Sequence, residues 1–490
     1  MKRPSRIGVG LAATVLAVGA VALFAFEGEK QEPDPAADGS TLTSTWVDSD
    51  EDGTLEVGPG EPIAEREDLA PVSPVVGEVA RVVQVSDAHI RDEESPARAV
   101  LLDRLSPLIS EAARPQETLS TQVLDAALRS ASAVEPDAII ETGDLIDSAQ
   151  ENELGQALSV LEGGRVAPDS GEDGYDGLQA ESNPDPFLYR PDLDSPRHPD
   201  LLDQAQEPFE STGTSVPWYP VLGNHDLLVQ GEVPPTPALE EIAIGDRQLV
   251  ELDRDLEAPE DATQLTPELV DTYLGDGLPG RTDAVAADPA RRYLSEAEVV
   301  SALREASSAG GSGNRLEYSF DVGERVRVIV LDIVDRSGGA AGLVDSEQIE
   351  WLRGELNAAG DRWVMIASHQ PLTTSEGGDA ALSLLDEYPR VIATLSGHAH
   401  STLIEPRETP AGGYWQLTAP ALADYPQQAR ALKVVETEDG VAIETWMLDT
   451  APGELADISR ELAYLDAGGG RPDEDEGTAS DRNARLFLAR

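Results

Sequence analysis

The chain of 490 residues contains no cysteine. It therefore forms no disulfide, no thiolate metal site and no cysteine nucleophile, and it offers no cysteine for lipid attachment. Histidine is scarce, with six in the whole chain, and lysine is scarcer, with three. A metal site in this protein must therefore be built from oxygen ligands and a small number of imidazoles.

Positive charge is also in short supply, because 93 acidic residues stand against 35 basic ones and give a formal net charge of −58. A surface this acidic repels nucleic acid, so neither DNA nor RNA is expected as a partner. It also keeps a protein soluble at high salt, which leads to the hypothesis of a salty habitat or an acidic proteome. The apolar fraction of 40% is ordinary and sufficient for a buried core.

The N-terminal residues 1–26 combine three basic residues with twenty mostly apolar ones from Ile7 to Phe26. The apolar stretch is long enough to span a bilayer, and its basic flank favours the inner side. Residues 20–22 (AVA) form a small-x-small cleavage site, so a cleaved signal peptide is the alternative to an anchor. Both interpretations predict an exported protein, either secreted or membrane-anchored with an extracytoplasmic domain. The polar, proline-containing residues 27–40 are expected to be a linker.

An acidic stretch, DSDEDG at residues 48–53, lies between two alternating segments. This pattern predicts a β-hairpin with an Asp-Gly turn. The stretch also matches the first half of a calcium-binding loop, but the twelfth position would be Pro59, where the motif needs glutamate. We therefore interpret it as a hairpin turn, with calcium binding as the alternative.

From residue 81 onward, short apolar runs end repeatedly in small and polar residues. The runs are VVQV (82–85), DAIIET (137–142), WYPVL (218–222), RVIVL (327–331), WVMIA (363–367) and VIATL (391–395). Buried strands have this composition, and functional sites gather where such strands end. Helical patterns lie between several runs. One of them, residues 346–359, is preceded by Asp345, and Gln348 stands three residues after Asp345, which is the spacing of a capping box. The alternation of strands and helices predicts an α/β fold.

Two stretches interrupt this alternation of strands and helices. Residues 151–215 are rich in glycine, proline and aspartate, and residues 230–313 contain helical pieces but no strand of the same kind. Both are expected to be insertions that lie over the strand ends. The expected domain organisation is one domain over 41–467, with core segments at about 81–230 and 314–450, followed by an acidic C-terminal tail over 468–490.

Five of the six histidines fall at the ends of four predicted strands, which chance does not explain. His398 and His400 follow the run VIATL, and residues i and i+2 of an extended chain point the same way, so both imidazoles can face one point. Neutral imidazole is a good ligand for transition metals. The exception, His198, lies in a loop and is expected to be exposed. The polar residues at the strand ends are Asp87, His89, Asp144, Asn224, His225, Asp226, His369, His398 and His400.

These residue types suit a dinuclear metal site, which holds the attacking and the leaving oxygen of an in-line displacement at phosphorus. Such a site needs a carboxylate that bridges the metals, a role open to Asp144, and a vacant bridging position for hydroxide. Asp87 and His89, at i and i+2, can bind one metal together. Asn224 and His225 are adjacent, so in extended structure one can bind metal while the other faces the substrate.

The motifs D-x-H, G-D-x-x-D, G-N-H-D, S-H and G-H-x-H occur in this order and resemble those of the calcineurin-like metallophosphoesterases. The resemblance covers the core segments and implies a four-layer α/β/β/α sandwich. It also implies two sets of metal ligands. Asp87, His89, Asp144 and His400 would bind the first metal, and Asp144, Asn224, His369 and His398 the second.

Further roles follow from the resemblance. His225 would stabilise the transition state or protonate the leaving group, Asp226 would orient His225, and Asp147 would lie behind the ligands or cap the following helix. Arg91 can reach a phosphate oxygen as a substrate contact, with a surface ion pair as the alternative. The tyrosine ligand of purple acid phosphatases has no counterpart in residues 145–147 (LID), so that branch is not expected.

The expected function is hydrolysis of a small phosphomonoester or phosphodiester by a metal-bridging hydroxide. Two ions of manganese, iron, zinc or nickel would suit the ligands. Stretches such as SDAHIRDEESPAR and YPQQAR resemble an exported, mostly actinobacterial subgroup whose substrate is not defined. Two alternatives are a cyclic-nucleotide phosphodiesterase, which shares the motifs in a shorter chain, and a non-catalytic scaffold that retains the fold.

Overall fold

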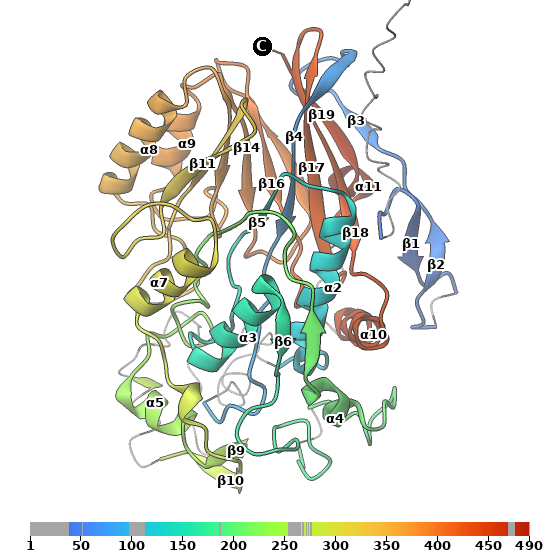
Figure 1. Cartoon of the computed structure of the whole chain (residues 1–490), viewed down its shortest axis with the longest axis vertical. Helices are drawn as coiled ribbons and strands as arrows, with labels where there is room; N and C mark the ends of the chain where they lie inside the picture. The colour runs from blue at the N-terminus through green and yellow to red at the C-terminus, as the bar shows by residue number, and fades with distance from the viewer. Residues whose placement is uncertain are drawn as a thin grey trace, which may run out of the picture. The chain divides into compact units, whose positions relative to one another are not determined.

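The computed structural model of the chain (Figure 1) describes residues 39–50, 52–97, 113–185, 188–252, 277–468 and 476–489, with 266, 269, 270, 272 and 274. The predicted anchor or signal segment, and the predicted linker up to residue 38, lie outside the described residues. Within the described ranges, no helix is both long and apolar enough to cross a membrane.

Two mixed β-sheets carry the fold. The first contains, in spatial order, β3 (Ala64–Arg66), β19 (Ala484–Ala489), β18 (Gly440–Asp449), β17 (Gln428–Thr437), β4 (Val75–Val85), β5 (Ala138–Glu141) and β8 (Trp218–Pro220). The second contains β11 (Tyr318–Val322), β12 (Val326–Val330), β13 (Trp363–Ala367), β14 (Val391–Ser396), β16 (Tyr414–Thr418) and β15 (Leu403–Arg407). Every apolar run that predicted a strand lies at least partly in one of them.

Helices cover the outer faces of these sheets (Figure 1). On the second sheet lie α8 (Ser346–Ala358) and α9 (Gly378–Leu385), whose apolar side chains form a common core with β12 and β13. On the first sheet lies α2 (Ser120–Ala133), which contacts β17 and β18 and is flanked by α10 (Glu454–Gly468). The result is the predicted α/β/β/α sandwich, because each sheet buries one face against the other sheet and one against helices.

The largest apolar core lies between the two sheets. It joins fully buried side chains of β4 and β5, such as Val83 and Ile139, to those of β12 and β14, such as Val328 and Leu395. These strands are apolar on both faces because both faces are covered, which is why the sequence shows continuous runs instead of strict alternation.

The predicted capping of α8 is confirmed at its N-terminus, where the Asp345 carboxylate accepts a hydrogen bond from the backbone N–H of Gln348 at 2.9 Å. The Gln348 side chain does not return the bond, because it donates to the Asp332 carbonyl oxygen at 2.7 Å. The predicted N-terminal hairpin is also confirmed, as β1 (Ser44–Val47) pairs antiparallel with β2 (Glu56–Pro59).

The C-terminal end differs from the expected separate tail. Residues 484–489 form β19, which pairs with β18 on one side and β3 on the other. The helix α11 (Ala479–Arg482) precedes it. The glycine and acidic residues around 470 hid this strand from the sequence reading, although ARLFLA has the apolar content of a buried strand.

The two predicted insertions form small elements of their own. The first contains α3 (Glu151–Glu162), β6 (Gly164–Val166), α4 (Leu201–Gln206) and β7 (Phe209–Ser211). The second contains α5 (Pro237–Ala243), β9 (Arg247–Leu252), β10 (Gly280–Ala284) and α7 (Glu296–Ala306). In the described part of the insertions, β6 pairs with β7 and β9 pairs with β10, as two-stranded sheets separate from the two main sheets.

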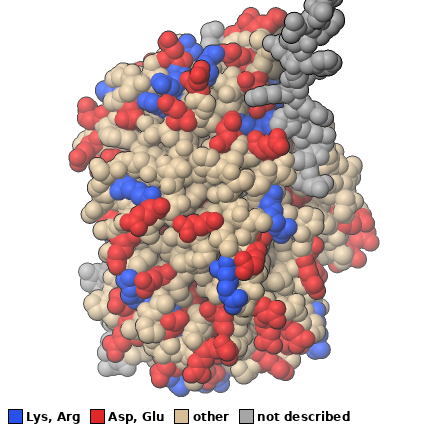
Figure 2. Space-filling view, in the orientation of Figure 1, with Lys and Arg blue, Asp and Glu red and all other residues tan. Residues whose placement is uncertain are grey.

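Acidic side chains are spread over the face of the molecule shown in Figure 2, with fewer lysines and arginines among them. Several of the basic side chains are engaged in ion pairs, as between Arg327 and Asp321 at 2.8 Å. The negative charge is therefore distributed over the surface and is only locally offset.

Candidate active site

The predicted site residues follow strands that run parallel within each sheet. In the first sheet β4, β5 and β8 are parallel neighbours, and in the second β13 and β14 are. Parallel strands end at the same edge of a sheet, so the residues that follow them are brought together. The two edges are joined by backbone hydrogen bonds, such as that from the Leu422 N–H to the Ser86 carbonyl oxygen at 3.1 Å.

The backbone turns sharply at these strand ends. Five of the predicted metal ligands have positive φ angles, namely Asp87 (53°), His89 (43°), Asp144 (54°), His398 (66°) and His400 (51°). This left-handed region is uncommon for residues other than glycine and is costly to occupy. Such strain gathers at functional sites, where it directs side chains that regular strand geometry would point elsewhere.

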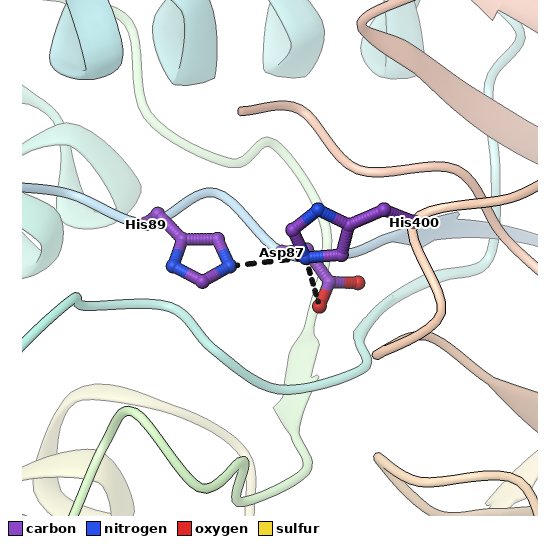
Figure 3. A group of neighbouring side chains, drawn as sticks. All are labelled: Asp87, His89 and His400. Carbon is purple, nitrogen blue, oxygen red and sulfur yellow. Dashed lines mark hydrogen bonds and ion pairs between the residues drawn. The ribbon is translucent and has the colours of Figure 1, made fainter. Parts of the chain in front are cut away.

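The first group of side chains is Asp87, His89 and His400 (Figure 3). The Nε2 atoms of His89 and His400 lie 3.2 Å apart, and the Nε2 of His400 lies 3.4 Å from Asp87 Oδ1. All three residues are buried. Two imidazole nitrogens and a carboxylate oxygen that converge in this way are a suitable donor set for a transition-metal ion.

The second group is Asp144, His369 and His398. The Nε2 of His369 is buried and lies 2.9 Å from Asp144 Oδ2. Its Nδ1 lies 2.8 Å from the Thr142 carbonyl oxygen. A carbonyl only accepts, so Nδ1 carries the proton and the lone pair of neutral His369 is on Nε2, as a metal ligand requires.

Asp144 lies between the two groups. Its Oδ2 is 2.9 Å from the Nε2 of His369 and 3.8 Å from the Nε2 of His89. Its Oδ1 accepts a hydrogen bond from the His225 backbone N–H at 2.8 Å. Burial alone would raise the pKa of the Asp144 carboxyl, but the nearby histidines outweigh it and hold that pKa well below its usual range.

The amide of Asn224, the fourth predicted ligand of the second metal, is held by hydrogen bonds at both ends. Its Nδ2 donates to the Gly231 carbonyl oxygen at 3.0 Å, which directs Oδ1 to the opposite side. There Oδ1 accepts from Gln370 Nε2 at 3.1 Å, and Gln370 also donates to the Ala340 carbonyl oxygen at 3.0 Å. The sequence reading missed Gln370, which follows His369 directly and fixes the amide orientation.

His225 is held by Asp147 and not by Asp226, which corrects the predicted pairing. The Nδ1 of His225 lies 2.9 Å from the Asp147 carbonyl oxygen and 3.4 Å from its Oδ1. The Asp226 carboxylate accepts instead from the backbone N–H groups of Ile146 and Gly223, at 3.1 and 2.8 Å. Asp226 therefore braces the two loops, while the His225 ring lies beside that of His89, with the ring centroids 4.4 Å apart.

Asp147 also supports a metal-ligand candidate, since its Oδ1 lies 3.2 Å from the Nδ1 of His89. Arg91 donates to the same oxygen at 2.5 Å and to Glu117 Oε2 at 2.5 Å. Arg91 is buried, with 3% of its surface exposed. This position does not favour the predicted contact with substrate phosphate and places Arg91 behind Asp147.

Glycines allow the loops to approach this closely. A Cβ atom on Gly223 would lie 2.2 Å from the backbone nitrogen and from Oδ1 of Asp144. One on Gly397 would lie 1.9 Å from the Ser86 hydroxyl oxygen and 2.3 Å from Asp87 Oδ2. The glycines that precede Asn224 and His398 in their motifs are therefore required by packing.

A family model described as calcineurin-like phosphoesterase matches residues 80–402 of the chain. The chain belongs to this family. The match spans the strand ends and every predicted metal ligand, so the protein is a hydrolase that acts on phosphoric esters, and its grouped carboxylates and imidazoles make it a metal-dependent one. No curated protein matches the chain.

Two solved structures are similar to this family member. A dimetal phosphatase from Danio rerio is 14% identical, with a TM-score of 0.40 over 76% of this chain and 98% of its own. A purple acid phosphatase from yellow lupin, Lupinus luteus, is 11% identical, with a TM-score of 0.32 over 83% and 58%. Similarity at this level carries no argument about the substrate or the metals.

Proposed function

We propose that the protein hydrolyses small phosphomonoesters or phosphodiesters at a dinuclear metal centre. The observation that carries the proposal is the position of Asp144, whose Oδ2 lies within 3.8 Å of a histidine nitrogen from each group. The first metal would be held by Asp87, His89, Asp144 and His400, and the second by Asp144, Asn224, His369 and His398. When bound, two such ions activate water as a nucleophile and neutralise charge on the phosphoryl group.

In this proposal His225 handles the leaving group. Its side chain is 19% exposed, more than those of the buried ligand histidines. The Asp147 carbonyl oxygen accepts a hydrogen bond from Nδ1, so Nε2 lies on the side of the ring that faces away from Asp147. From there Nε2 can donate a proton to the departing alkoxide oxygen, as a general acid does.

The insertions over residues 151–215 and 230–313 would form a cap that limits substrate size. Both are tied to the loops of the site. Arg291 in the second insertion pairs with Asp92 at 2.8 Å, and Ser170 in the first donates to Asp92 at 2.8 Å. Asp92 lies three residues after His89, so both insertions meet beside the first ligand motif.

The acidic surface makes phosphate binding depend on the metals. A phosphate ester that approaches this protein meets a negative field, and bound cations are the strongest local positive charges in such a site. We expect the metal-free protein to bind no inorganic phosphate. Binding of equal strength before and after chelation, measured by titration calorimetry, would contradict this.

The N-terminal residues 1–26 would direct export of the protein, either as a cleaved signal or as an anchor. Nucleic acid is not proposed as a partner, because the charge opposes it. Fractionation of producing cells followed by N-terminal sequencing would distinguish a cleaved from an anchored chain, and a cytoplasmic, uncleaved protein would overturn the proposal.

The first experiment compares hydrolysis of p-nitrophenyl phosphate and bis-p-nitrophenyl phosphate by the manganese-loaded protein, in low and in molar salt. The matched variant is Asp144→Asn, which keeps the side-chain shape and removes the charge. We expect it to lose at least one metal equivalent and about 100-fold or more in turnover, the upper range for altered metal-site residues. The preferred ester would identify a monoesterase or a diesterase.

Two results would contradict the proposal. Two metals retained in Asp144→Asn would remove its bridging role. No metal bound by the wild-type protein, together with no turnover, would favour a scaffold that keeps the fold without the chemistry.

A further inference from the structure

A buried ion pair lies directly behind His400. The Nδ1 of His400 is 2.5 Å from Asp424 Oδ2, and Asp424 accepts two hydrogen bonds from Arg114, from Nε to Oδ1 at 2.7 Å and from Nη2 to Oδ2 at 2.9 Å. Arg114 and Asp424 are 4% and 3% exposed. None of the five motifs contains either residue, and they are 310 positions apart.

The ion pair fixes the His400 imidazole in the tautomer that a metal ligand needs, with the proton on Nδ1. The Arg114 guanidinium holds the Asp424 carboxylate in place, and Asp424 Oδ2 is positioned to accept the Nδ1 proton of His400. The lone pair of neutral His400 is then on Nε2, which faces Asp87 Oδ1 at 3.4 Å. A carboxylate behind a ligand histidine orients the ring and raises its basicity.

The same arrangement occurs on the other histidine of this group. His89 is backed by Asp147, and Asp147 is paired with Arg91. The two supports meet at Glu117 Oε2, which accepts from Arg91 Nη1 at 2.5 Å and from the Arg114 backbone N–H at 3.0 Å. Both imidazoles of the first group therefore rest on carboxylates that are paired with arginines in one buried network.

The second group is supported differently. His369 rests on the neutral Thr142 carbonyl oxygen, at 2.8 Å. A carboxylate makes the imidazole a better donor than a carbonyl does, because it stabilises positive charge on the ring. The two groups thus differ in the strength of their histidine ligands, although each contains two histidines.

We propose that Asp424 and Arg114 are positioning residues for His400, and that their carboxylate support makes the site of Asp87, His89 and His400 the tighter of the two metal sites. This inference rests on the proposed dinuclear function. Asp147 contributes the matching support on His89, but it also holds His225, so Asp424 is the cleaner residue to test.

The test is titration calorimetry of the metal-free full-length protein with Mn²⁺. The wild-type protein is expected to show two binding events of different affinity. In Asp424→Asn the tighter event should weaken about 10- to 100-fold, the usual effect of losing such a support, while the weaker event stays the same. Unchanged binding, or a loss confined to the weaker event, would overturn the inference.

The matched control is Asp92→Asn. Asp92 is 1% exposed and pairs with the buried Arg291 at 2.8 Å, and among the described residues it forms no hydrogen bond or ion pair with a histidine. A general effect of breaking a buried ion pair would change both variants alike and overturn the positioning role, whereas the inference expects both events to survive in Asp92→Asn.

A second variant covers the case in which Asp424→Asn does not fold. Arg114→Lys keeps the positive charge but cannot donate two parallel hydrogen bonds to Asp424. The tighter binding event should therefore weaken by a smaller factor than in Asp424→Asn. Binding equal to that of wild type would overturn the inference. A wild-type protein without two binding events would overturn the proposed function itself, which separates that failure from a failure of the variants.

Discussion

His225 is partly exposed, and its ring is held by Asp147. It rests on the backbone oxygen of Asp147 and not on a residue of its own motif. A group that donates a proton to the leaving alcohol should matter most for alcohols that leave poorly, because p-nitrophenolate departs without protonation. This difference separates the two roles that the sequence left open for His225.

We expect His225→Gln to keep both metals and to slow hydrolysis of an alkyl phosphate by about 100- to 10,000-fold. Hydrolysis of p-nitrophenyl phosphate should fall much less. The measurement is kcat for both esters together with metal content. An equal loss for both esters would assign His225 to transition-state stabilisation, and unchanged rates would remove it from the chemistry.

Asp449 gives a pH dependence that is separate from the site. Burial raises the pKa of this carboxyl to about 6, although Gln428 donates a hydrogen bond to it at 2.7 Å. The folded-state pKa lies above the unfolded-state value of roughly 4, so ionisation of Asp449 costs stability. The cost grows as pH rises from about 4 to about 6 and is complete above that range.

The variant Asp449→Asn removes this cost. The variant's free energy of unfolding should exceed that of wild type by up to about 3 kcal/mol more at pH 7 than at pH 4, the equivalent of a shift of two pKa units. Urea unfolding of both proteins at both pH values measures the difference, in which the other titrating groups cancel. A difference that does not change with pH would contradict the assignment.

At the scale of elements, the turns that follow the strands decide the geometry of the site more than the strands themselves do. The strand ends were predictable because buried runs and polar termini are visible in sequence. The direction of each side chain was not, because it depends on left-handed backbone at residues such as Asp144 and His398. The assignment of Asp226 to His225 failed because the order of residues in a motif does not show which distant side chain lies closest to each of them, and the partner of His225 is Asp147 from another motif.

The glycines of these turns provide a test. In Gly223→Ala the new methyl group would meet Asp144, so we expect a loss of about 1–3 kcal/mol in stability, as for other overpacked sites, and a lower metal content. Gly354 in α8 is the control, because a Cβ there meets nothing within 4 Å. Gly354→Ala should stabilise the protein by about 0.5–1 kcal/mol. Equal effects in urea unfolding would show that the contact with Asp144 is unimportant.

For the whole molecule, the net charge of −58 opposes the compact state through self-repulsion. Salt reduces this repulsion, since the screening length falls to about 3 Å at 1 M. We therefore expect the unfolding midpoint to rise by several degrees between about 0.1 and 2 M KCl, where about 1 kcal/mol corresponds to 2–4 °C in domains of 150–250 residues.

Calorimetric scans at several KCl concentrations check this prediction. Near pH 4, where many carboxylates are protonated, the salt effect should shrink, which provides an internal control. A midpoint that does not rise with salt at neutral pH would contradict the proposed adaptation to a salty environment.

The sequence by itself determined the fold class, the family resemblance and the candidate ligands, because these depend on local apolar runs and on short motifs at their ends. Only the tertiary structure decided how those residues are supported. Asp424, Arg114 and Gln370 lie outside the motifs, and β19 joins its sheet from a terminus that looked like a polar tail. The Arg114–Asp424 and Asn224–Gln370 contacts join residues 310 and 146 positions apart, and neither periodicity nor spacing shows which distant side chain will fill a buried position.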